Sequence, residues 1–391
     1  MPILQVKEMH EAEIQKVRID DLAKLGEGVT RTERGILFIP RVLPGEEVKV
    51  EVIKKRRFPI GRVVEVVTPS PYRIEPLCPY FGSCTGCQWQ HIDYDFQLKL
   101  KYEKVHYEFS SAGIEQAPIL PVIPSPKVLN YRNHARFTVK NGVIGFVNRE
   151  DFHFVPIASC YIMDEGINSV LKNFQGIPVE TSQLSVRYGV QTGDILIQPR
   201  LESSRILSGQ EFYHEILSKQ RFRISAGAFF QVNTFGAEMI VKMIAKRVEG
   251  VRILIDAYAG VGTFFSIFSS QVEKMIAMEE SSSAFEDAMV NLAGMDNVRF
   301  LKEKAEKAIL EIDECPDAVI LDPPRSGCRG EMIQALLKLL PQRIIYVSCN
   351  PASLAQDIKS LLQSYEINEI QPVDLFPYTH HVECVTILEI R

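Results

Sequence analysis

Between about residue 226 and the C-terminus, short apolar runs alternate with longer stretches of helical spacing. No other feature of the sequence constrains the fold as strongly. The runs cover residues 252–255, 274–278, 318–321 and 344–347. Strand-like runs separated by helices are typical of an open, mostly parallel sheet with helices on both faces. The sequence therefore predicts an α/β fold here, a Rossmann-like domain over residues 226–391.

The first part of the chain has a different pattern. Strand-like runs at 36–39, 48–52 and 63–67 are separated by turns rich in glycine and proline. Short strands at such spacing predict a small, OB-like β-barrel, which we assign to residues 1–70. The remaining residues, 71–225, form a third predicted domain with a helical stretch at 94–112 and β-rich character from residue 131 onward.

The charge balance of the whole chain shows no bulk affinity for nucleic acid. Lys and Arg number 44 against 49 Asp and Glu, so the formal net charge is −5. Binding to RNA would then depend on local basic patches. The stretch 41–62 is such a patch, and its densest part is Lys54-Lys55-Arg56-Arg57. It is either a face that grips an RNA backbone or a solvated basic hairpin.

The sequence predicts a cytoplasmic protein with no membrane partner. No apolar run reaches the roughly 18 residues that a transmembrane helix needs. The first 21 residues alternate charged and apolar side chains, unlike a signal peptide. We therefore expect the eight cysteines to be mostly reduced and a disulfide framework to be absent.

Three cysteines, Cys78, Cys84 and Cys87, lie within ten positions of one another, and Cys160 follows far downstream. An iron–sulfur cluster with three local ligands and one remote ligand fits this spacing. A structural zinc site normally uses two close cysteine pairs, whereas here the first gap is long and the second pair is missing. The spacing alone leaves an iron–sulfur cluster, a zinc site and buried free cysteines open.

The strand-like run at 253–255 continues as Asp256-Ala257-Tyr258-Ala259-Gly260-Val261-Gly262, which reads as a strand followed by a Gly-x-Gly turn. These glycines let the backbone approach a ligand closely. The turn lacks the third glycine of the dinucleotide fingerprint and the lysine of a phosphate loop. Glu279, about 20 residues further on, can accept both ribose hydroxyls. The combination suits S-adenosylmethionine, and the alternative is a Rossmann-like turn with an unused glycine pair.

Reactive side chains follow the next two strand-like runs. Asp322-Pro323-Pro324-Arg325 comes after the run at 318–321, and Cys349 comes after the run at 344–347. The carboxyl ends of strands are where open α/β sheets bind ligands. Glu383 precedes a final run at 385–388.

A cysteine and a carboxylate beside a methyl donor suit methylation at C5 of a pyrimidine. C5 alone is a poor nucleophile, but a thiolate that adds to C6 makes it reactive, and a base must afterwards remove the C5 proton. Cys349 and Glu383 fit these two roles. The alternative is a buried strand-end thiol and a solvated carboxylate.

On these residues the chain resembles the uracil-5 RNA methyltransferases, over nearly its whole length. The first β region, with Gly26-Glu27-Gly28 and Val42-Leu43-Pro44-Gly45-Glu46, resembles the RNA-binding TRAM domain. Asp322-Pro-Pro-Arg-Ser-Gly, Ser348-Cys-Asn-Pro and His381-Val-Glu383 match the catalytic signatures of the family.

The resemblance implies roles for individual residues. It makes Cys349 the nucleophile and Glu383 the base, and it makes Cys78, Cys84, Cys87 and Cys160 the ligands of a [4Fe-4S] cluster. S-adenosyl-L-methionine is the implied methyl donor. The residues predicted to bind this donor, including those of the glycine turn, are Gln231, Asp256, Tyr258, Gly260, Gly262, Glu279 and Asp322.

The resemblance also favours one substrate. The bacterial tRNA enzyme of this family lacks both the TRAM domain and the cluster, so the two together favour 23S rRNA. An archaeal-type tRNA enzyme carries both, so the tRNA T-loop is the alternative. A catalytically inactive RNA-binding or assembly factor is a third interpretation, which the presence of Cys349, Glu383 and Gly260 disfavours. We expect the protein to be a monomer.

Overall fold

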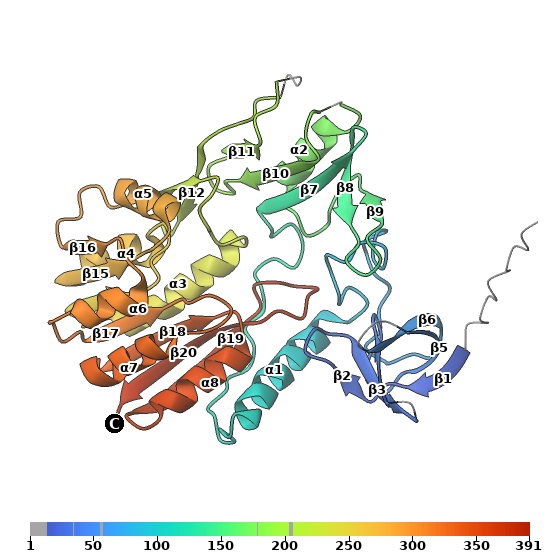
Figure 1. Cartoon of the computed structure of the whole chain (residues 1–391), viewed down its shortest axis with the longest axis horizontal. Coiled ribbons are helices and arrows are strands. Elements are labelled where there is room, and N and C mark those ends of the chain that lie inside the picture. Colours follow the sequence, from blue (N-terminus) through green and yellow to red (C-terminus); the bar gives the residue numbers. More distant parts are fainter. Residues whose placement is uncertain (1–13, 34, 55–57, 178, 203–205) are drawn as a thin grey trace, which may run out of the picture. The chain divides into compact units, whose positions relative to one another are not determined.

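The computed structural model describes residues 14–33, 35–54, 58–177, 179–202 and 206–391. The chain divides into two compact units. The first unit is Met1–Gln97 with Tyr378–His380, and the second is Leu98–Pro377 with His381–Arg391. Most elements of the two units are labelled in Figure 1.

The first unit is built on a six-stranded sheet in the order β1-β5-β6-β4-β3-β2. Its strands are β1 (Ile14–Arg18), β2 (Asp21–Leu22), β3 (Gly28–Thr32), β4 (Gly35–Ile39), β5 (Glu47–Lys54) and β6 (Pro59–Thr68). The core of the sheet is a small apolar cluster that includes Leu37, Ile39, Val48 and Val50. Gly61 is required by close packing, because a Cβ there would lie 2.8 Å from Ile39 Cγ1.

The second unit contains a seven-stranded sheet in the order β16-β15-β14-β17-β18-β20-β19, drawn in yellow-orange to red in Figure 1. Its strands are β14 (Ile253–Asp256), β15 (Lys274–Met278), β16 (Val298–Leu301), β17 (Ala318–Leu321), β18 (Arg343–Ser348), β19 (Tyr365–Val373) and β20 (Glu383–Ile390). All neighbours are parallel except that β20 runs antiparallel to β18 and β19.

Alternate residues of these strands belong to two separate cores, so both faces of the sheet are covered. Leu254 and Ile320 pack in one core with helices α3 (Thr234–Val248), α4 (Thr263–Phe268) and α5 (Ser282–Asn291). Ile255 and Val319 pack in the other core. The helices of that core are α1 (Tyr94–Ser111), α6 (Ala305–Ala308), α7 (Gly330–Leu339) and α8 (Pro351–Leu361). The predicted Rossmann-like fold is confirmed.

A second sheet of the same unit has the order β11-β10-β7-β8-β9. It consists of β7 (His134–Lys140), β8 (Val143–Val147), β9 (Phe154–Pro156), β10 (Gln183–Tyr188) and β11 (Ile195–Gln198), and it is followed by the hairpin β12 (Phe212–Leu217) and β13 (Gln220–Ser225). Helix α2 (Glu165–Phe174) buries Ile167, Leu171 and Phe174. Asn141 and Gly142 both have positive φ, as a tight hairpin turn requires.

Short 3-10 turns at Ser269–Gln271 and Ile309–Glu311 complete the regular structure. Among the described residues, no helix is both long enough and apolar enough to cross a membrane.

Candidate active site

A cavity of about 720 Å³ opens in the second unit, at the carboxyl ends of β14, β15, β17 and β18. This volume is in the usual range for small-molecule sites. Most of the residues predicted to bind the donor or to react line it, namely Gln231, Tyr258, Gly260, Glu279, Asp322, Cys349 and Glu383. These side chains come from distant parts of the sequence, and the parallel sheet brings them to one edge.

The glycine turn after β14 forms part of the cavity wall. Gly260 has φ +56, and a Cβ there would meet nothing within 4 Å, so this backbone faces open space. Its N–H donates to Glu279 Oε2 at 2.9 Å, and Glu279 Oε1 accepts from Ser281 N at 2.6 Å. The two strand ends are thereby tied together, which fixes the carboxylate predicted to bind a ribose.

Gly262 and Asp256 are not among the residues that line the cavity. Gly262 has φ +90 and caps α4, and a Cβ there would lie 2.2 Å from the Phe265 ring. Glycine is therefore needed at position 262 because the Phe265 ring leaves no room for a side chain. Asp256 is completely buried, and its burial and the nearby Asp322 raise the pKa of its carboxyl to about 8. Direct contact of these two residues with a donor stays a prediction.

The remaining donor-site residues are held by neighbours. Tyr258 OH donates to Glu306 Oε1 at 3.2 Å, and burial raises the pKa of this phenol. The carbonyl of Gln231 accepts from Asn133 Nδ2 at 3.2 Å, which fixes the backbone of the segment Phe229-Phe230-Gln231. Gln231 and Tyr258 both line the cavity.

Strand register brings the predicted nucleophile and base together. Strand β18 pairs with β20 in antiparallel register, with Ser348 opposite Cys384. Cys349 directly follows Ser348 and Glu383 directly precedes Cys384, so the two residues flank the last pair of this register, and both line the cavity. Glu383 is only 4% exposed. Asp322 follows β17, the other neighbour of β18, and lines the same cavity.

The electrostatics of this group are dominated by burial. Burial and the Glu383 carboxylate raise the pKa of Cys349 to about 11, while Arg325 acts in the opposite direction. Burial also raises the pKa of Asp322 to about 7, and burial and Asp322 raise the pKa of Glu383. Strongly shifted ionisable groups that share one cavity are typical of catalytic sites.

Several other cavity residues did not emerge from the sequence as site residues. Arg325 follows Asp322-Pro323-Pro324, and His381 stands two residues before Glu383, so their closeness in sequence to predicted site residues could have identified them. Nothing in the sequence pattern singled out Arg132, Lys304 or Phe376, which also line the cavity. The carbonyl of Arg325 accepts from Asn350 Nδ2 at 2.8 Å and from Ser353 Oγ at 3.2 Å, so α8 holds the loop that carries Arg325.

The cysteine loop of the first unit, residues 78–87, is shaped by local backbone contacts. Phe81 N donates to Cys78 O at 3.0 Å, Cys84 N donates to Tyr80 O at 2.7 Å, and Cys78 N donates to Gln90 Oε1 at 3.1 Å. Cys78, Cys84 and Cys87 are half-buried thiols. Cys160, also a half-buried thiol, belongs to the second unit.

Within the part of the chain that the structure describes, no three His, Cys, Asp or Glu side chains are arranged as a group that could hold a metal ion. The donor set nevertheless has the right chemistry for an iron–sulfur cluster, which thiolates bind. The structure thus brings the predicted catalytic residues to one cavity, and the cluster and its four ligands stay a prediction.

Comparison with protein families identifies two regions of the chain. Residues 178–391 match the family described as tRNA (uracil-5-)-methyltransferase. Residues 10–66 match the TRAM domain.

Similar proteins cover nearly the whole chain. An uncharacterized RNA methyltransferase of Gloeobacter violaceus is 32% identical over 95% of this chain and 96% of its own length. One from Oceanobacillus iheyensis is 32% identical over 97% of each. The crystal structure of Pyrococcus abyssi tRNA (uracil-54, C5)-methyltransferase with S-adenosyl-L-homocysteine is similar with a TM-score of 0.74 and 26% identity, covering 96% of this chain and all of that one.

These matches agree with the TRAM-type first sheet, the Rossmann-like second sheet and the cavity at its edge. The chain is therefore an enzyme and belongs to the S-adenosylmethionine-dependent uracil-5 RNA methyltransferases.

Proposed function

We propose that the protein transfers a methyl group to C5 of a specific uridine in 23S rRNA, through a covalent adduct between Cys349 and C6 of the base. The observation that carries this proposal is that Cys349 and Glu383, which flank the last residue pair between β18 and β20, both line one cavity. The target base has to leave its stack to reach such a site, as base-modifying enzymes generally require.

Each step assigns a task to a residue of the chain. The Cys349 thiolate adds to C6 and turns C5 into a nucleophilic enolate carbon. Bound S-adenosylmethionine supplies an electrophilic methyl group at this point, and S-adenosylhomocysteine is left. Glu383 then removes the proton from C5, and the C6–S bond breaks so that the thiolate and 5-methyluridine are released.

The other residues of the cavity support these two. Arg325 favours the thiolate form of Cys349, because its positive charge opposes the effects of burial and Glu383. Glu279, Tyr258, Gly260 and Gln231 would hold the donor from the side of β14 and β15, and Asp322 would do so from β17. Asp256 and Gly262 would shape the turn that presents Gly260.

The preference for 23S rRNA rests on the presence of both a TRAM domain and the four cysteines. The test uses two unmodified transcripts, one of 23S rRNA and one of tRNA, incubated with the enzyme and labelled S-adenosylmethionine. Label in 5-methyluridine of the rRNA alone supports the proposal. Label in the tRNA alone overturns the choice of substrate. No label in either overturns the reaction.

The second candidate substrate is the T-loop uridine of tRNA. It is favoured by the likeness to the Pyrococcus abyssi enzyme, whose substrate is named as uridine 54 of tRNA. The chemistry and the residues would be the same in both cases, so only the choice of RNA distinguishes the two proposals.

We also propose that Cys78, Cys84, Cys87 and Cys160 hold a [4Fe-4S] cluster with a structural role. All four are half-buried thiols, and methyl transfer needs no electron. In this proposal the chain has three domains, at 1–70, 71–225 and 226–391, and the cluster belongs to the central one. Absorbance near 400 nm together with bound iron and sulfide would support the cluster. Stoichiometric zinc with neither iron nor sulfide would overturn it.

A further inference from the structure

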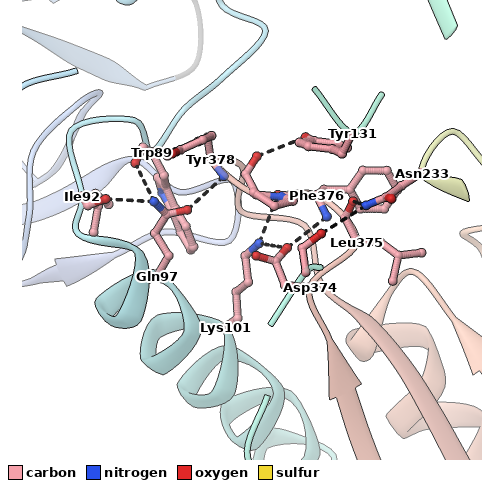
Figure 2. A network of polar contacts seen from close by, with 12 residues as sticks. Trp89, Ile92, Gln97, Lys101, Tyr131, Asn233, Asp374, Leu375, Phe376 and Tyr378 are labelled. Atoms are coloured by element: carbon pink, nitrogen blue, oxygen red, sulfur yellow. Dashed lines mark hydrogen bonds and ion pairs between the residues drawn. The ribbon is translucent and has the colours of Figure 1, made fainter. Parts of the chain in front are cut away.

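The second unit contains a buried ion pair that the chemistry described so far does not use. Lys101 of α1 and Asp374, just after β19, are both completely buried, and Lys101 Nζ lies 2.5 Å from Asp374 Oδ1. Figure 2 shows the pair within a network of polar contacts. The two residues are 273 positions apart in the sequence.

Both members of the pair form hydrogen bonds with the backbone of Phe376. Lys101 Nζ donates to Phe376 O at 3.1 Å, and Asp374 Oδ1 accepts from Phe376 N at 3.0 Å. Both polar groups of this peptide position are thus satisfied by the two partners of the ion pair.

The neighbouring carbonyls are held in the same way. Asn233 Nδ2 donates to Leu375 O at 2.9 Å, and Tyr131 OH donates to Pro377 O at 3.1 Å (Figure 2). Consecutive carbonyls from 375 to 377 therefore each accept a hydrogen bond from a different side chain. Three separate donors hold this segment, which lies between strands β19 and β20.

This segment precedes Glu383, the predicted general base, and contacts its neighbours. Phe376 lines the cavity, and its ring packs edge-on against that of His381, with centroids 5.9 Å apart. His381 also lines the cavity and stands two residues before Glu383. A displacement of Phe376 would therefore be passed to His381 and to the start of β20.

Stability alone does not explain a pair of this kind. Removing two charges from water is costly, and a well-packed apolar pair is often at least as stabilising as a buried ion pair. What an apolar pair cannot do is bond to both the N–H and the carbonyl of Phe376. The specific contribution of Lys101 and Asp374 is the orientation of the two peptide groups on either side of Phe376.

We propose that Lys101 and Asp374 are positioning residues for the proton-removal step, holding Phe376 and, through its ring contact with His381, the start of β20, so that the Glu383 carboxyl group faces the adduct on Cys349. This rests on the proposed function. Because only the second half of the reaction uses Glu383, loss of the pair should slow release of product more than formation of the adduct.

The test is a double variant, Lys101→Met with Asp374→Leu, which removes both charges without leaving either one buried alone. The matched control is Lys99→Met, two positions away on the same helix, where the side chain is 60% exposed and pairs with Glu103. Unmodified 23S rRNA and tRNA transcripts serve as substrates. Single-turnover reactions are quenched and run on denaturing gels, which separate the methylated adduct from released RNA.

We expect the double variant to bind S-adenosylmethionine as the wild type does and to form adduct at a similar rate. Release should slow by about tenfold or more, short of the roughly hundredfold or larger loss from removing a general base outright. Lys99→Met should leave both rates unchanged. A residue with only a structural role would lower the melting temperature and slow both steps alike, and that result would overturn the proposal.

Tyr131→Phe provides a second route if the double variant does not fold, since it removes only the hydroxyl that donates to Pro377 O. It should slow release by a smaller factor, and normal release from it would then count against the proposal. Glu383→Gln serves as the reference for trapped adduct. No adduct from Glu383→Gln would overturn the proposed function, whereas adduct there with normal release from the double variant would overturn only the positioning role.

Discussion

The two main sheets of the protein bury their strands in different ways. In the sheet of β14 to β20, all four residues of β17 and five of the six residues of β18 are buried. In the first sheet, β1 alternates exposed and half-buried residues, and only one residue of β6 is buried. A strand that is packed on both faces holds the residue at its end rigidly, whereas a half-exposed strand offers side chains to a partner.

This difference in strand burial predicts different effects for substitutions in the two units. Substitutions at the strand ends of the second unit should remove chemistry and leave the fold intact. Substitutions in the first unit should change metal content or RNA affinity and leave the chemical steps intact.

The largest effect is expected for Cys349→Ala. Without a thiolate no adduct forms, so methyl transfer should cease while S-adenosylmethionine still binds. Methyl-transfer assays and calorimetric titration with the donor measure the two properties. The control is Cys315→Ala, because Cys315 is an exposed thiol outside the cavity. Methylation by Cys349→Ala would show that a group other than the Cys349 thiolate adds to C6 of the uracil.

Next in size is Glu383→Gln. The thiolate can still add and the methyl group can still transfer, but C5 keeps its proton, so turnover should fall by about a hundredfold to ten-thousandfold. A methylated enzyme–RNA adduct should survive denaturing electrophoresis. Glu389→Gln is the control, since Glu389 lies near the other end of β20 and pairs with Arg343. Normal turnover by Glu383→Gln would mean that a different group accepts the proton.

The pH dependence should follow the thiol of the free enzyme. With the pKa of Cys349 raised to about 11 by burial and Glu383, the thiolate is the minor form at neutral pH and increases as pH rises. The rate of adduct formation at low RNA concentration should therefore climb by up to about tenfold per pH unit between about pH 7 and 9.

Arg325→Met sharpens this prediction. Arg325 lowers the pKa of Cys349, so its loss should raise that pKa and slow adduct formation throughout the same interval. A rate that is flat with pH would show that the thiol is already ionised in the free enzyme.

In the first unit, Cys84→Ala should lower iron content and soluble yield through loss of a cluster ligand. The protein that does fold should retain its methyl-transfer rate at saturating RNA, because no electron enters the reaction. Iron analysis beside the Cys315→Ala protein measures the effect. Iron at full stoichiometry in Cys84→Ala would contradict the ligand assignment.

The smallest effect is expected for the basic stretch Lys54–Arg57, of which residues 55–57 lie outside those that the structure describes. Neutralising it should weaken RNA binding and reduce the slope of log affinity against log salt by roughly 0.7 for each phosphate that the protein no longer neutralises. Turnover at saturating RNA should not change. An unchanged slope would remove the predicted role in RNA binding.

Much of the catalytic unit could be predicted from the sequence because its signals are local. A strand buried on both faces has to be a continuous apolar run, so β14, β15, β17 and β18 could be located from the sequence. The residues directly after such strands had to meet at one sheet edge, and Asp322 and Cys349 do so. Asp256 and Gly262 do not line the cavity although they lie beside Gly260, because proximity in sequence does not show which residues of a turn face a cavity.

The sequence by itself determined which chemical groups are available, and it placed most of them at strand ends, because strand periodicity and turn residues act over a few positions. Tertiary structure decided how these groups meet. The antiparallel pairing of β18 with β20 ends at Ser348 and Cys384 and so brings the adjoining Cys349 and Glu383 to one cavity, and the pairing of Lys101 with Asp374 joins residues 273 positions apart. Neither follows from local patterns, since register and burial arise only when distant segments pack together.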